Sequence, residues 1–545
     1  MHGNMMNTQL LVIDLLDYAR QQFPHQEIVS QRLEGDIHRY TYRDAWQRSC
    51  RLAHALEQLG VGMNDCIASM AWNTYRHLEL YYAVSGIGAV LHTVNPRLFA
   101  DQVEYIINHA EDKYVFVDLG FLAMLEEIQP RLPTVKGFIV LTDAEHMPEI
   151  SLTNVYCYET LLAAVGDEGN TYPWPRFDEN QAASLCYTSG TTGNPKGVLY
   201  SHRAMVLHAQ ATVSPALLDL RADTVLMPMV AMYHAGAWGA PYAAPLAGCK
   251  LVLPGSGMSG AAMWQLIEQE QVNVGLGVPT IWLTLHNYLQ EHGISKVPLE
   301  RVCVGGAASP IGMVRTYQEQ YGVYWQPIWG MTETGPLATS LPPTPAIMGL
   351  PLEQRYALQT TAGRAAFGVE MDIFAADDRL VAHDGESSGE LRVRGPWICS
   401  QYYKNDDLSS FPNGWLATGD IAVIDPQGYM RVVDRKKDVI KSGGEWISSL
   451  EIENIVSLHS AVNECAVVGV KHPKWDERPL LLVVLNKGMQ ASETDILQYL
   501  SGKIAKWWTP DAVEFVRELP KTGTGKVRKN ELRDVYINYL EERGV

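Results

Sequence analysis

The chain alternates between amphipathic helix patterns and short apolar strand patterns. Residues 42–60, "YRDAWQRSCRLAHALEQLG", place apolar side chains three and four positions apart and end at Gly60, which predicts an amphipathic helix. The segments that follow predict a strand, a helix and a strand, namely "DCIASMA", "TYRHLELYYAVSGIGAV" and "KYVFVD". This alternation is typical of parallel sheets covered by helices, so we expect an α/β fold.

A second stretch of this kind runs from about Thr224 to Trp329, and the pattern changes beyond about Ala365. There "GELRVRGPWI" and "IAVIDPQGYMRVVD" predict a small antiparallel or barrel-like unit. After "DRKKDVIKSGG" we expect a further compact region. It has a helix at "SSLEIENIVSLH", strands at "ECAVVGVK" and "PLLLVVL", and a final helix after "GTGKVRKNELRDVY".

Length and charge limit the possible classes of protein. A chain of 545 residues is too long for one hydrophobic core and suggests two to four domains or subdomains. Its 47% apolar and 19% charged residues are ordinary for a soluble globular protein and exclude disorder and collagen. The net charge of −18 argues against nucleic acid or an anionic membrane as the main partner. Any anion must therefore be bound by a local site.

Cysteine usage and the N-terminus predict a cytoplasmic protein. The eight cysteines are scattered, with no CxxC pair and no Cys/His spacing typical of a metal site, so we expect reduced thiols. No stretch approaches the roughly 20 apolar residues that a membrane span needs. The N-terminus lacks a basic region followed by a small-residue cleavage site, so we expect no signal peptide.

One glycine-rich segment imitates a dinucleotide-binding fingerprint. Gly255, Gly257 and Gly260 are spaced as GxGxxG between a predicted strand and a predicted helix. The fingerprint requires an acidic residue about 20 positions further on, and that region reads "GLGVPTIW". Pro254 also occupies the point where the strand should enter the turn. We therefore interpret the segment as a glycine-rich turn that caps a helix.

The segment "CYTSGTTGNPKGVLYSH", residues 186–202, has the composition of an anion-binding loop. It is not a Walker A loop, because Lys196 is preceded by Pro195 and followed by Gly197, which breaks the required spacing. Hydroxyl donors, glycines that allow close backbone approach and one lysine favour a lid for a polyphosphate over a plain surface hairpin. The residues concerned are Thr188, Ser189, Gly190, Thr191, Thr192, Gly193 and Lys196.

This loop resembles the phosphate loop of the adenylate-forming superfamily, which includes acyl-CoA synthetases, firefly-type luciferases and peptide-synthetase adenylation domains. Further motifs of that superfamily follow in its order, so the resemblance covers nearly the whole chain. They are "GGAASP", "WGMTET", "WLATGD", "DRKKDVIKSGGEWIS" and "PKTGTGKVRK".

The resemblance implies roles for individual residues. Thr332 contacts the nucleotide phosphate, Glu333 binds Mg²⁺, Asp420 holds the ribose hydroxyls, Arg435 contacts the nucleotide, and Lys526 is the catalytic lysine for adenylation. An ionised carboxylate such as that of Asp420 can accept two hydroxyl hydrogen bonds. The adenine-side loop and the signature add to the nucleotide site the residues Gly306, Ala307, Ala308, Trp329, Gly330 and Met331.

The chemistry that the resemblance implies suits these residue types. A carboxylate is a poor electrophile, so the acid first attacks the α-phosphate of ATP, which gives an acyl-adenylate and expels pyrophosphate. Lys526 and a Mg²⁺ on Glu333 can stabilise the negative charge that develops there. The thiol of coenzyme A then attacks the acyl carbonyl and AMP leaves. ATP, Mg²⁺ and coenzyme A are therefore the expected cofactors and co-substrate.

The resemblance also implies the domain organisation. It gives an N-terminal domain, residues 1–434, of two αβαβα subdomains plus a small distorted β-barrel, and a mobile α+β C-terminal domain, residues 435–545. The small domain is expected to turn about a hinge near Lys437 between the two half-reactions. Lys441 lies near the rotated face in relatives, and Trp446 resembles the aromatic gate of fatty acyl-CoA synthetases, with core packing as its alternative.

The acyl end of the site is expected around "MYHAGAWGAPYAAPLAG". His234 matches a position beside the substrate carboxylate in relatives. Apolar lining without an obvious buried cation suggests an apolar acyl tail, and the absence of an acidic residue between Ala231 and Gly239 argues against an amino acid. The residues expected to line the pocket are Trp238, Gly239, Val278, Trp282, Gly306, Trp329 and Met331.

The whole chain looks most similar to medium-chain fatty acyl-CoA synthetases and methylmercaptopropionate-CoA ligases. "TGPLAT" after the signature, and Ala235 with Gly236, depart from that pattern and leave the acyl chain length open. The alternatives are an arylalkanoate-CoA ligase, an adenylating enzyme that passes its acyl group to a carrier protein or an amine, and a non-catalytic nucleotide-binding relative. The presence of all the motif residues disfavours the last. A homodimer is possible, but the sequence does not decide the oligomeric state.

Overall fold

The computed structural model describes residues 1, 3–188, 194–443, 445–521 and 527–543. The chain divides into two compact units. Unit 1 consists of Met1–Gly190, Asn194–Glu370 and Arg394–Gly414, and unit 2 contains Met371–Val393 and Trp415–Val545.

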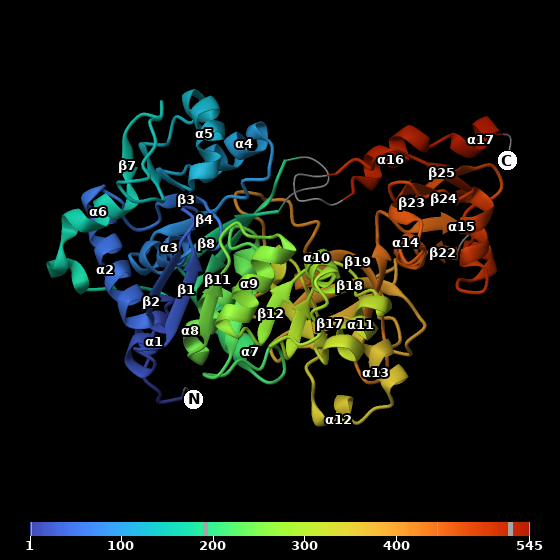
Figure 1. The fold of residues 1–545 in the computed structure, drawn as a ribbon, viewed down its shortest axis with the longest axis horizontal. Coiled ribbons are helices and arrows are strands. Elements are labelled where there is room, and N and C mark those ends of the chain that lie inside the picture. The colour runs from blue at the N-terminus through green and yellow to red at the C-terminus, as the bar shows by residue number, and fades with distance from the viewer. Residues whose placement is uncertain (2, 189–193, 444, 522–526, 544–545) are drawn as a thin grey trace. The chain divides into compact units, whose positions relative to one another are not determined.

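Among the described residues, unit 1 contains a seven-stranded sheet with the order β7-β6-β5-β3-β4-β8-β9 (Figure 1). All neighbours pair in parallel except β8 and β9, which form an antiparallel hairpin. Strands β3, β4, β5 and β6 are buried along their whole length, as expected of a parallel sheet covered on both faces. The strands are β3 (Cys66–Met70), β4 (Val90–Thr93), β5 (Tyr114–Val117), β6 (Gly137–Val140), β7 (Val155–Cys157), β8 (Ala182–Tyr187) and β9 (Gly197–Ser201).

A second sheet in unit 1 has nine strands within the described part of the chain, in the order β16-β15-β14-β13-β12-β10-β11-β1-β2. Its centre is parallel, and antiparallel pairs close both edges. The strands are β1 (Glu27–Gln31), β2 (Ile37–Thr41), β10 (Val225–Pro228), β11 (Lys250–Leu253), β12 (Val274–Gly277), β13 (Arg301–Val304), β14 (Tyr324–Gly330), β15 (Leu337–Ser340) and β16 (Arg364–Ala365).

Helices connect the strands of both sheets. The predicted first amphipathic helix is confirmed as α2 (Tyr42–Gln58), which begins at a capping box between Thr41 and Asp44. The glycine-rich turn is also confirmed: α9 (Gly260–Glu270) begins after Ser259, whose hydroxyl accepts from the Ala262 N–H. The other helices are α1 (Ile13–Gln22), α3 (Tyr75–Gly86), α4 (Ala100–Ala110), α5 (Leu122–Ile128), α6 (Tyr158–Val165), α7 (His202–Val213), α8 (Ala240–Ala247), α10 (Pro279–Glu291), α11 (Ile311–Tyr321), α12 (Pro345–Met348) and α13 (Leu352–Gln359).

The small antiparallel unit predicted beyond residue 365 is confirmed as a sheet of β17 (Glu370–Phe374), β18 (Gly389–Arg394), β19 (Leu416–Ile424) and β20 (Met430–Arg435). The rest of unit 2 is α+β. Two apolar clusters use alternate residues of β23 and β24, one on each face of their sheet. Its elements are β21 (Ile440–Ser442), β22 (Glu445–Ile447), β23 (Val462–His472), β24 (Asp476–Leu485), β25 (Ala512–Phe515), α14 (Ser449–Val456), α15 (Glu493–Leu500), α16 (Lys529–Tyr536) and α17 (Tyr539–Arg543).

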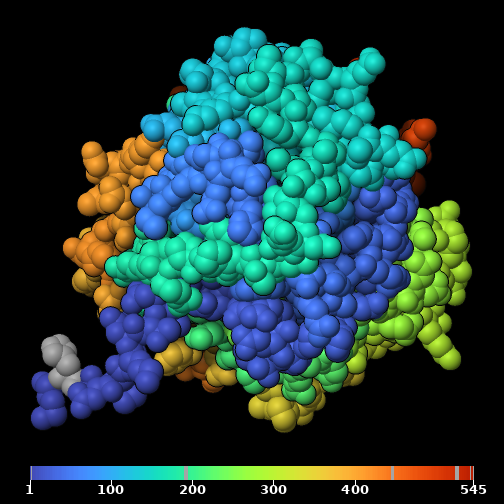
Figure 2. Space-filling view, turned by 90° about the vertical axis from the view of Figure 1, so that its left-hand side faces the viewer, coloured from blue at the N-terminus to red at the C-terminus, as the bar shows by residue number. Residues whose placement is uncertain are grey.

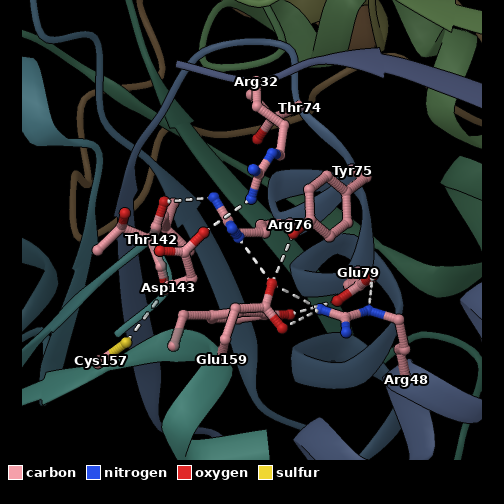
Figure 3. Close-up of polar contacts among 12 residues, drawn as sticks. Arg32, Arg48, Thr74, Tyr75, Arg76, Glu79, Thr142, Asp143, Cys157 and Glu159 are labelled. Carbon is pink, nitrogen blue, oxygen red and sulfur yellow. Dashed lines mark hydrogen bonds and ion pairs between the residues drawn. The ribbon is translucent and has the colours of Figure 1, made fainter. Parts of the chain in front are cut away.

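A buried network of ion pairs joins the two sheets of unit 1 (Figure 3). Arg76 on α3 pairs with Glu34, which follows β1, at 2.6 Å and with Glu159 on α6 at 2.8 Å. Arg48 on α2 contacts Glu79 at 2.7 Å and Glu159 at 3.0 Å. The Arg76 side chain is 3% exposed, so its charge is compensated by these carboxylates and not by water.

The surface beside this network is built from segments that are distant in sequence. Figure 2 shows this face, where blue segments from the first hundred residues lie beside teal segments from about 150–180. Arg51 on α2 pairs with Asp167 at 2.7 Å and donates to the Asn170 side chain at 2.8 Å. The Asp167 side chain is 91% exposed, so this pair lies in solvent, unlike the Arg76 network.

Two further expectations can be compared with the structure. The eight cysteines all lie in the described part of the chain and are free thiols, as predicted. Within the described residues, every helix is too short or too polar to cross a membrane.

We expect Arg76→Met to lower the free energy of unfolding by about 3 kcal/mol, because Glu34 and Glu159 would lose a buried partner. The matched control is Arg51→Met, which removes a solvent-exposed pair on the same side of unit 1 and should cost roughly 1 kcal/mol or less. Denaturant midpoints of the two variants compare these losses. Equal losses would show that the buried network does not hold the sheets together.

Candidate active site

The base of the phosphate loop is formed by the β8–β9 hairpin. The Thr188 N–H donates to the Lys196 carbonyl at 2.9 Å, and the Lys196 N–H donates to Thr188 Oγ1 at 3.4 Å. These two predicted residues therefore lie opposite each other where the loop leaves the sheet. The other predicted loop residues lie outside the described part of the chain, namely Ser189, Gly190, Thr191, Thr192 and Gly193.

The signature begins at the end of β14, with Trp329 and Gly330, and continues through Met331 into a 3₁₀ turn, Thr332–Thr334. Gly330 has no room for a side chain, because a Cβ there would lie 1.8 Å from the Pro336 carbonyl oxygen. The chain therefore reverses tightly against the segment that leads into β15. This reversal leaves Thr332 and Glu333 each 6% exposed.

Glu333 is held from two sides by the segment 399–403. The Tyr402 hydroxyl donates to Glu333 Oε1 at 2.7 Å, and the Cys399 N–H donates to the Glu333 carbonyl at 2.8 Å. Burial and the Glu333 carboxylate raise the pKa of Tyr402 above its usual value, so this hydroxyl remains protonated. The Tyr200 hydroxyl from β9 donates to the Thr332 carbonyl at 2.6 Å. Neither Tyr402 nor Tyr200 belongs to a motif that marks it in the sequence.

Lys196 and Glu333 share an aromatic neighbour. The Lys196 Nζ lies 4.7 Å from the centroid of the Tyr402 ring, whose hydroxyl is bonded to Glu333. Within unit 1, the structure thus brings the phosphate-loop lysine and the proposed metal ligand to the same side chain, the lysine over its ring and the carboxylate at its hydroxyl.

The adenine-side loop follows β13. Gly306 has φ +78°, and a Cβ at this position would lie 3.2 Å from Val278 Cγ1. Gly306 and Val278, both expected to line the acyl pocket, are therefore neighbours. Gly306 and Ala307 are exposed, and Ala308 is half-buried.

The predicted acyl side contains a left-handed turn. Residues 235–239 all have positive φ, from 46° at Ala235 to 82° at Gly239. This conformation raises the free energy by roughly 1–2 kcal/mol for each residue other than glycine. Helix α3 holds the segment: the Tyr81 and Tyr82 hydroxyls donate to carbonyls at Met232 and Pro241. Directly before the turn, His234 is half-buried, and Trp238 within it is 8% exposed.

A buried histidine connects this turn to the start of β15, which follows the signature. A Cβ on Gly239 would lie 2.7 Å from His208 Cε1, so only glycine fits against that ring. His208 Nε2 accepts from the Leu337 N–H at 3.0 Å. Burial lowers the pKa of His208 to about 3, so the ring is neutral and can accept this hydrogen bond. The sequence analysis did not identify His208.

The structure places Trp282, expected to line the pocket, in the hydrophobic core of unit 1. Its side chain is fully buried, and its Nε1 donates to the Gly277 carbonyl at 3.1 Å. A Cβ on Gly275 would lie 2.4 Å from the ring, so the indole fills the space that these strand glycines leave. The Trp282 side chain therefore packs on the core side of the segment next to Val278.

In unit 2, the two predicted nucleotide contacts form a cross-strand pair. Asp420 on β19 lies opposite Arg435 on β20, and Arg435 Nε is 2.9 Å from Asp420 Oδ1. The Asp420 side chain is 3% exposed, whereas that of Arg435 is 47% exposed. The arginine can therefore contact a ligand while it orients the buried carboxylate.

The predicted hinge and the second-step residues also lie in unit 2. Burial lowers the pKa of Lys437, and the nearby cations Arg435 and Arg533 act in the same direction. Lys441 is exposed on β21, where its N–H donates to Glu477 Oε2 at 2.9 Å. Trp446 pairs with Lys441 in the register of β21 and β22.

Lys526 lies outside the described residues, but both flanks of its segment are anchored. The Arg528 N–H donates to the Pro520 carbonyl at 2.8 Å. Lys529 Nζ lies 2.7 Å from Glu453 Oε1 and donates to Ser449 Oγ at 2.7 Å. These contacts fix the point where the lysine segment enters α16.

The donor set around Glu333 fits Mg²⁺. A carboxylate oxygen is a hard ligand, and Mg²⁺ in nucleotide sites is bound by one or two carboxylates together with phosphate oxygens. Among the described residues, no three His, Cys, Asp or Glu side chains gather as a metal cluster. Glu333 would thus hold the ion together with a nucleotide.

Comparison with known proteins agrees with this arrangement. The profile of the AMP-binding enzyme family matches residues 16–403, and that of the AMP-binding enzyme C-terminal domain matches residues 451–526. The chain is 43% identical over 540 residues to a medium-chain-fatty-acid–CoA ligase of Ectopseudomonas oleovorans, covering 99% of this chain and 98% of the relative. It is 45% identical over 541 residues to a 3-methylmercaptopropionyl-CoA ligase of Ruegeria lacuscaerulensis, covering 99% of this chain and 100% of the relative.

Solved structures show the same fold. An anthranilate CoA ligase in complex with anthranoyl-AMP superposes with a TM-score of 0.84 at 24% identity, covering 98% of this chain and 99% of the other. The o-succinylbenzoate coenzyme A synthetase of Bacillus subtilis, in complex with ATP and a magnesium ion, gives 0.78 at 22% identity, covering 95% and 99%. The fold class and the superfamily predicted from the motifs are confirmed. The chain belongs to the family of AMP-binding enzymes, in the branch of the acyl-CoA ligases.

Proposed function

We propose that this chain is an ATP-dependent acyl-CoA ligase that activates an apolar carboxylic acid through an acyl-adenylate. The observation that carries the proposal is that Tyr402 contacts both groups: its hydroxyl donates to buried Glu333, and the Lys196 ammonium lies over its ring. A carboxylate for Mg²⁺ beside a phosphate-loop cation is what activation of a triphosphate requires.

In the first half-reaction, unit 1 holds the triphosphate. Thr188 and Lys196 orient the β- and γ-phosphates, which leave as pyrophosphate, and the Thr332 hydroxyl contacts the α-phosphate. Mg²⁺ bound at Glu333 would neutralise phosphate charge. The Gly306–Ala308 loop bounds the adenine side, and Val278 lines the adjoining acyl pocket, supported by its close approach to Gly306.

The motifs assign further nucleotide contacts to Asp420, Arg435 and Lys526. Asp420, oriented by Arg435, accepts hydrogen bonds from the ribose hydroxyls, and Arg435 contacts the nucleotide. Lys526 stabilises the charge that develops on the α-phosphate. A domain of residues 435–545 then turns about Lys437, and Lys441 serves the second half-reaction, in which coenzyme A takes the acyl group. Trp446 acts as an aromatic gate for the acyl substrate.

The acid is apolar in this proposal, a medium-chain fatty acid or a similar compound. Support comes from the two relatives named above and from the turn 235–239, whose side chains are apolar. His234 stands beside the substrate carboxylate, and Trp238 contacts the acyl chain. The 45% identity to a 3-methylmercaptopropionyl-CoA ligase makes 3-methylmercaptopropionate the second candidate. The free cysteines and acidic charge support a cytoplasmic location.

A panel of acids tests the substrate class. With butyrate, hexanoate and octanoate, we expect CoA-dependent AMP release to rise with chain length until the pocket is full, because each buried CH₂ contributes about 0.8 kcal/mol. A higher kcat/KM for 3-methylmercaptopropionate than for octanoate would favour the second candidate. No AMP release with any apolar acid would contradict the proposal.

The acceptor is tested in the same panel. Pyrophosphate exchange should proceed without coenzyme A, and AMP release should follow when coenzyme A is added. Exchange that is not followed by thioester formation would instead indicate a carrier protein or an amine as the acceptor.

Lys526→Ala should separate the half-reactions. We expect adenylation to fall by roughly 10²–10³, because a cation aimed at the developing phosphate charge is lost. Thioester formation from supplied acyl-adenylate should change much less. The matched control is Lys521→Ala in the same segment, where the lysine pairs with Glu464. Equal loss of both half-reactions would contradict the role of Lys526.

A further inference from the structure

The segment 399–403 contacts both the signature and the phosphate loop. Two of its groups bind Glu333, as described above, and the Tyr403 N–H donates to the Gly197 carbonyl at 2.8 Å. Gly197 directly follows Lys196. One short stretch of chain therefore fixes the start of β9 and the signature turn with respect to each other.

Tyr402 contacts two groups of opposite charge. Its ring faces the Lys196 Nζ at 4.7 Å, while its hydroxyl donates to Glu333 Oε1 at 2.7 Å. The residue is 8% exposed, so water does not screen these groups well. A smaller side chain would allow the ammonium and the carboxylate to approach, and a direct pair would occupy both groups needed for the nucleotide.

We propose that Tyr402 is a positioning residue with two separable parts: its hydroxyl orients the Glu333 carboxylate for the metal, and its ring holds Lys196 for the phosphates. The inference rests on the proposed function, because it assigns Mg²⁺ to Glu333 and phosphates to Lys196. Neither part of Tyr402 touches the reacting atoms. Its effect on turnover is exerted through Glu333 and Lys196.

Tyr200 provides a matched comparison. Its hydroxyl donates to the Thr332 carbonyl at 2.6 Å, so it supports the same turn as Tyr402. Both residues are 8% exposed. The difference is that Tyr200 binds the backbone and Tyr402 binds the carboxylate. A purely structural tether would make the two hydroxyls equivalent.

The experiment compares Tyr402→Phe, Tyr402→Leu, Tyr200→Phe and Tyr403→Phe. Metal binding is measured without turnover, by titrating Mn²⁺ into the full-length protein in the presence of a non-hydrolysable α,β-methylene analogue of ATP. The electron paramagnetic resonance signal of Mn²⁺ is followed during the titration. The adenylation rate is measured in parallel against Mg²⁺ and against ATP. Thermal unfolding of each variant verifies that it is folded.

We expect Tyr402→Phe to weaken metal binding roughly tenfold, because a hydrogen bond to a charged group is lost, while KM for ATP at saturating Mg²⁺ stays near that of the wild type. Tyr402→Leu should add a roughly threefold rise in KM for ATP, because the cation–π contact is lost as well. Tyr200→Phe should lower thermal stability without moving the Mn²⁺ midpoint. Tyr403→Phe should behave as the wild type.

An unchanged Mn²⁺ midpoint in Tyr402→Phe, or an equal shift in Tyr200→Phe, would overturn the inference. Tyr402→Phe differs from the wild type by one oxygen and carries the metal test even if Tyr402→Leu does not fold. A wild-type protein that binds the metal and the analogue but activates no acid would contradict the proposed function while Tyr402 is still tested by binding.

Discussion

The active-site arrangement depends on a carboxylate that is removed from water before any ligand arrives. Burial of an acid is costly unless donors satisfy it, and Glu333 receives one from a hydroxyl at 2.7 Å. Its backbone is bound as well, through the Cys399 N–H. This requirement explains why the signature turn, the first residues of β9 and the segment 399–403 are joined into one cluster. It also explains Gly330, since a side chain there would push the turn away from its donors.

Much of the fold could be predicted from the sequence, because its signals are local. The spacing in residues 42–60 and the cap at Thr41 specify α2 without help from the rest of the chain. Residues of the motifs could likewise be named from their order. The turn that carries Glu333 and the β8–β9 hairpin are short local elements within those motifs.

The supporting residues could not be predicted, because their contacts are distant in sequence. Tyr402 and Glu333 form a hydrogen bond although they are 69 positions apart in the sequence, and the hydrogen-bonded residues His208 and Leu337 are 129 positions apart. Nothing in "QYYKND" or "RAMVLHAQ" distinguishes a residue that orients a carboxylate from an ordinary aromatic or histidine. Trp282, in contrast, was named from its motif, but the structure places its side chain in the core. Its neighbourhood suggested a pocket, but the glycines of β12 leave room for its ring inside the core.

The left-handed turn at residues 235–239 has a consequence for how such enzymes diversify. Hydroxyls of α3 fix both of its flanks by hydrogen bonds to the carbonyls of Met232 and Pro241. The His208 ring packs against Gly239 and leaves no room for a side chain there. An insertion or deletion in this stretch would break those anchors, whereas exchange of a side chain within it leaves them intact. New acyl preferences should therefore arise here by point substitution, with the length of the segment preserved across lineages.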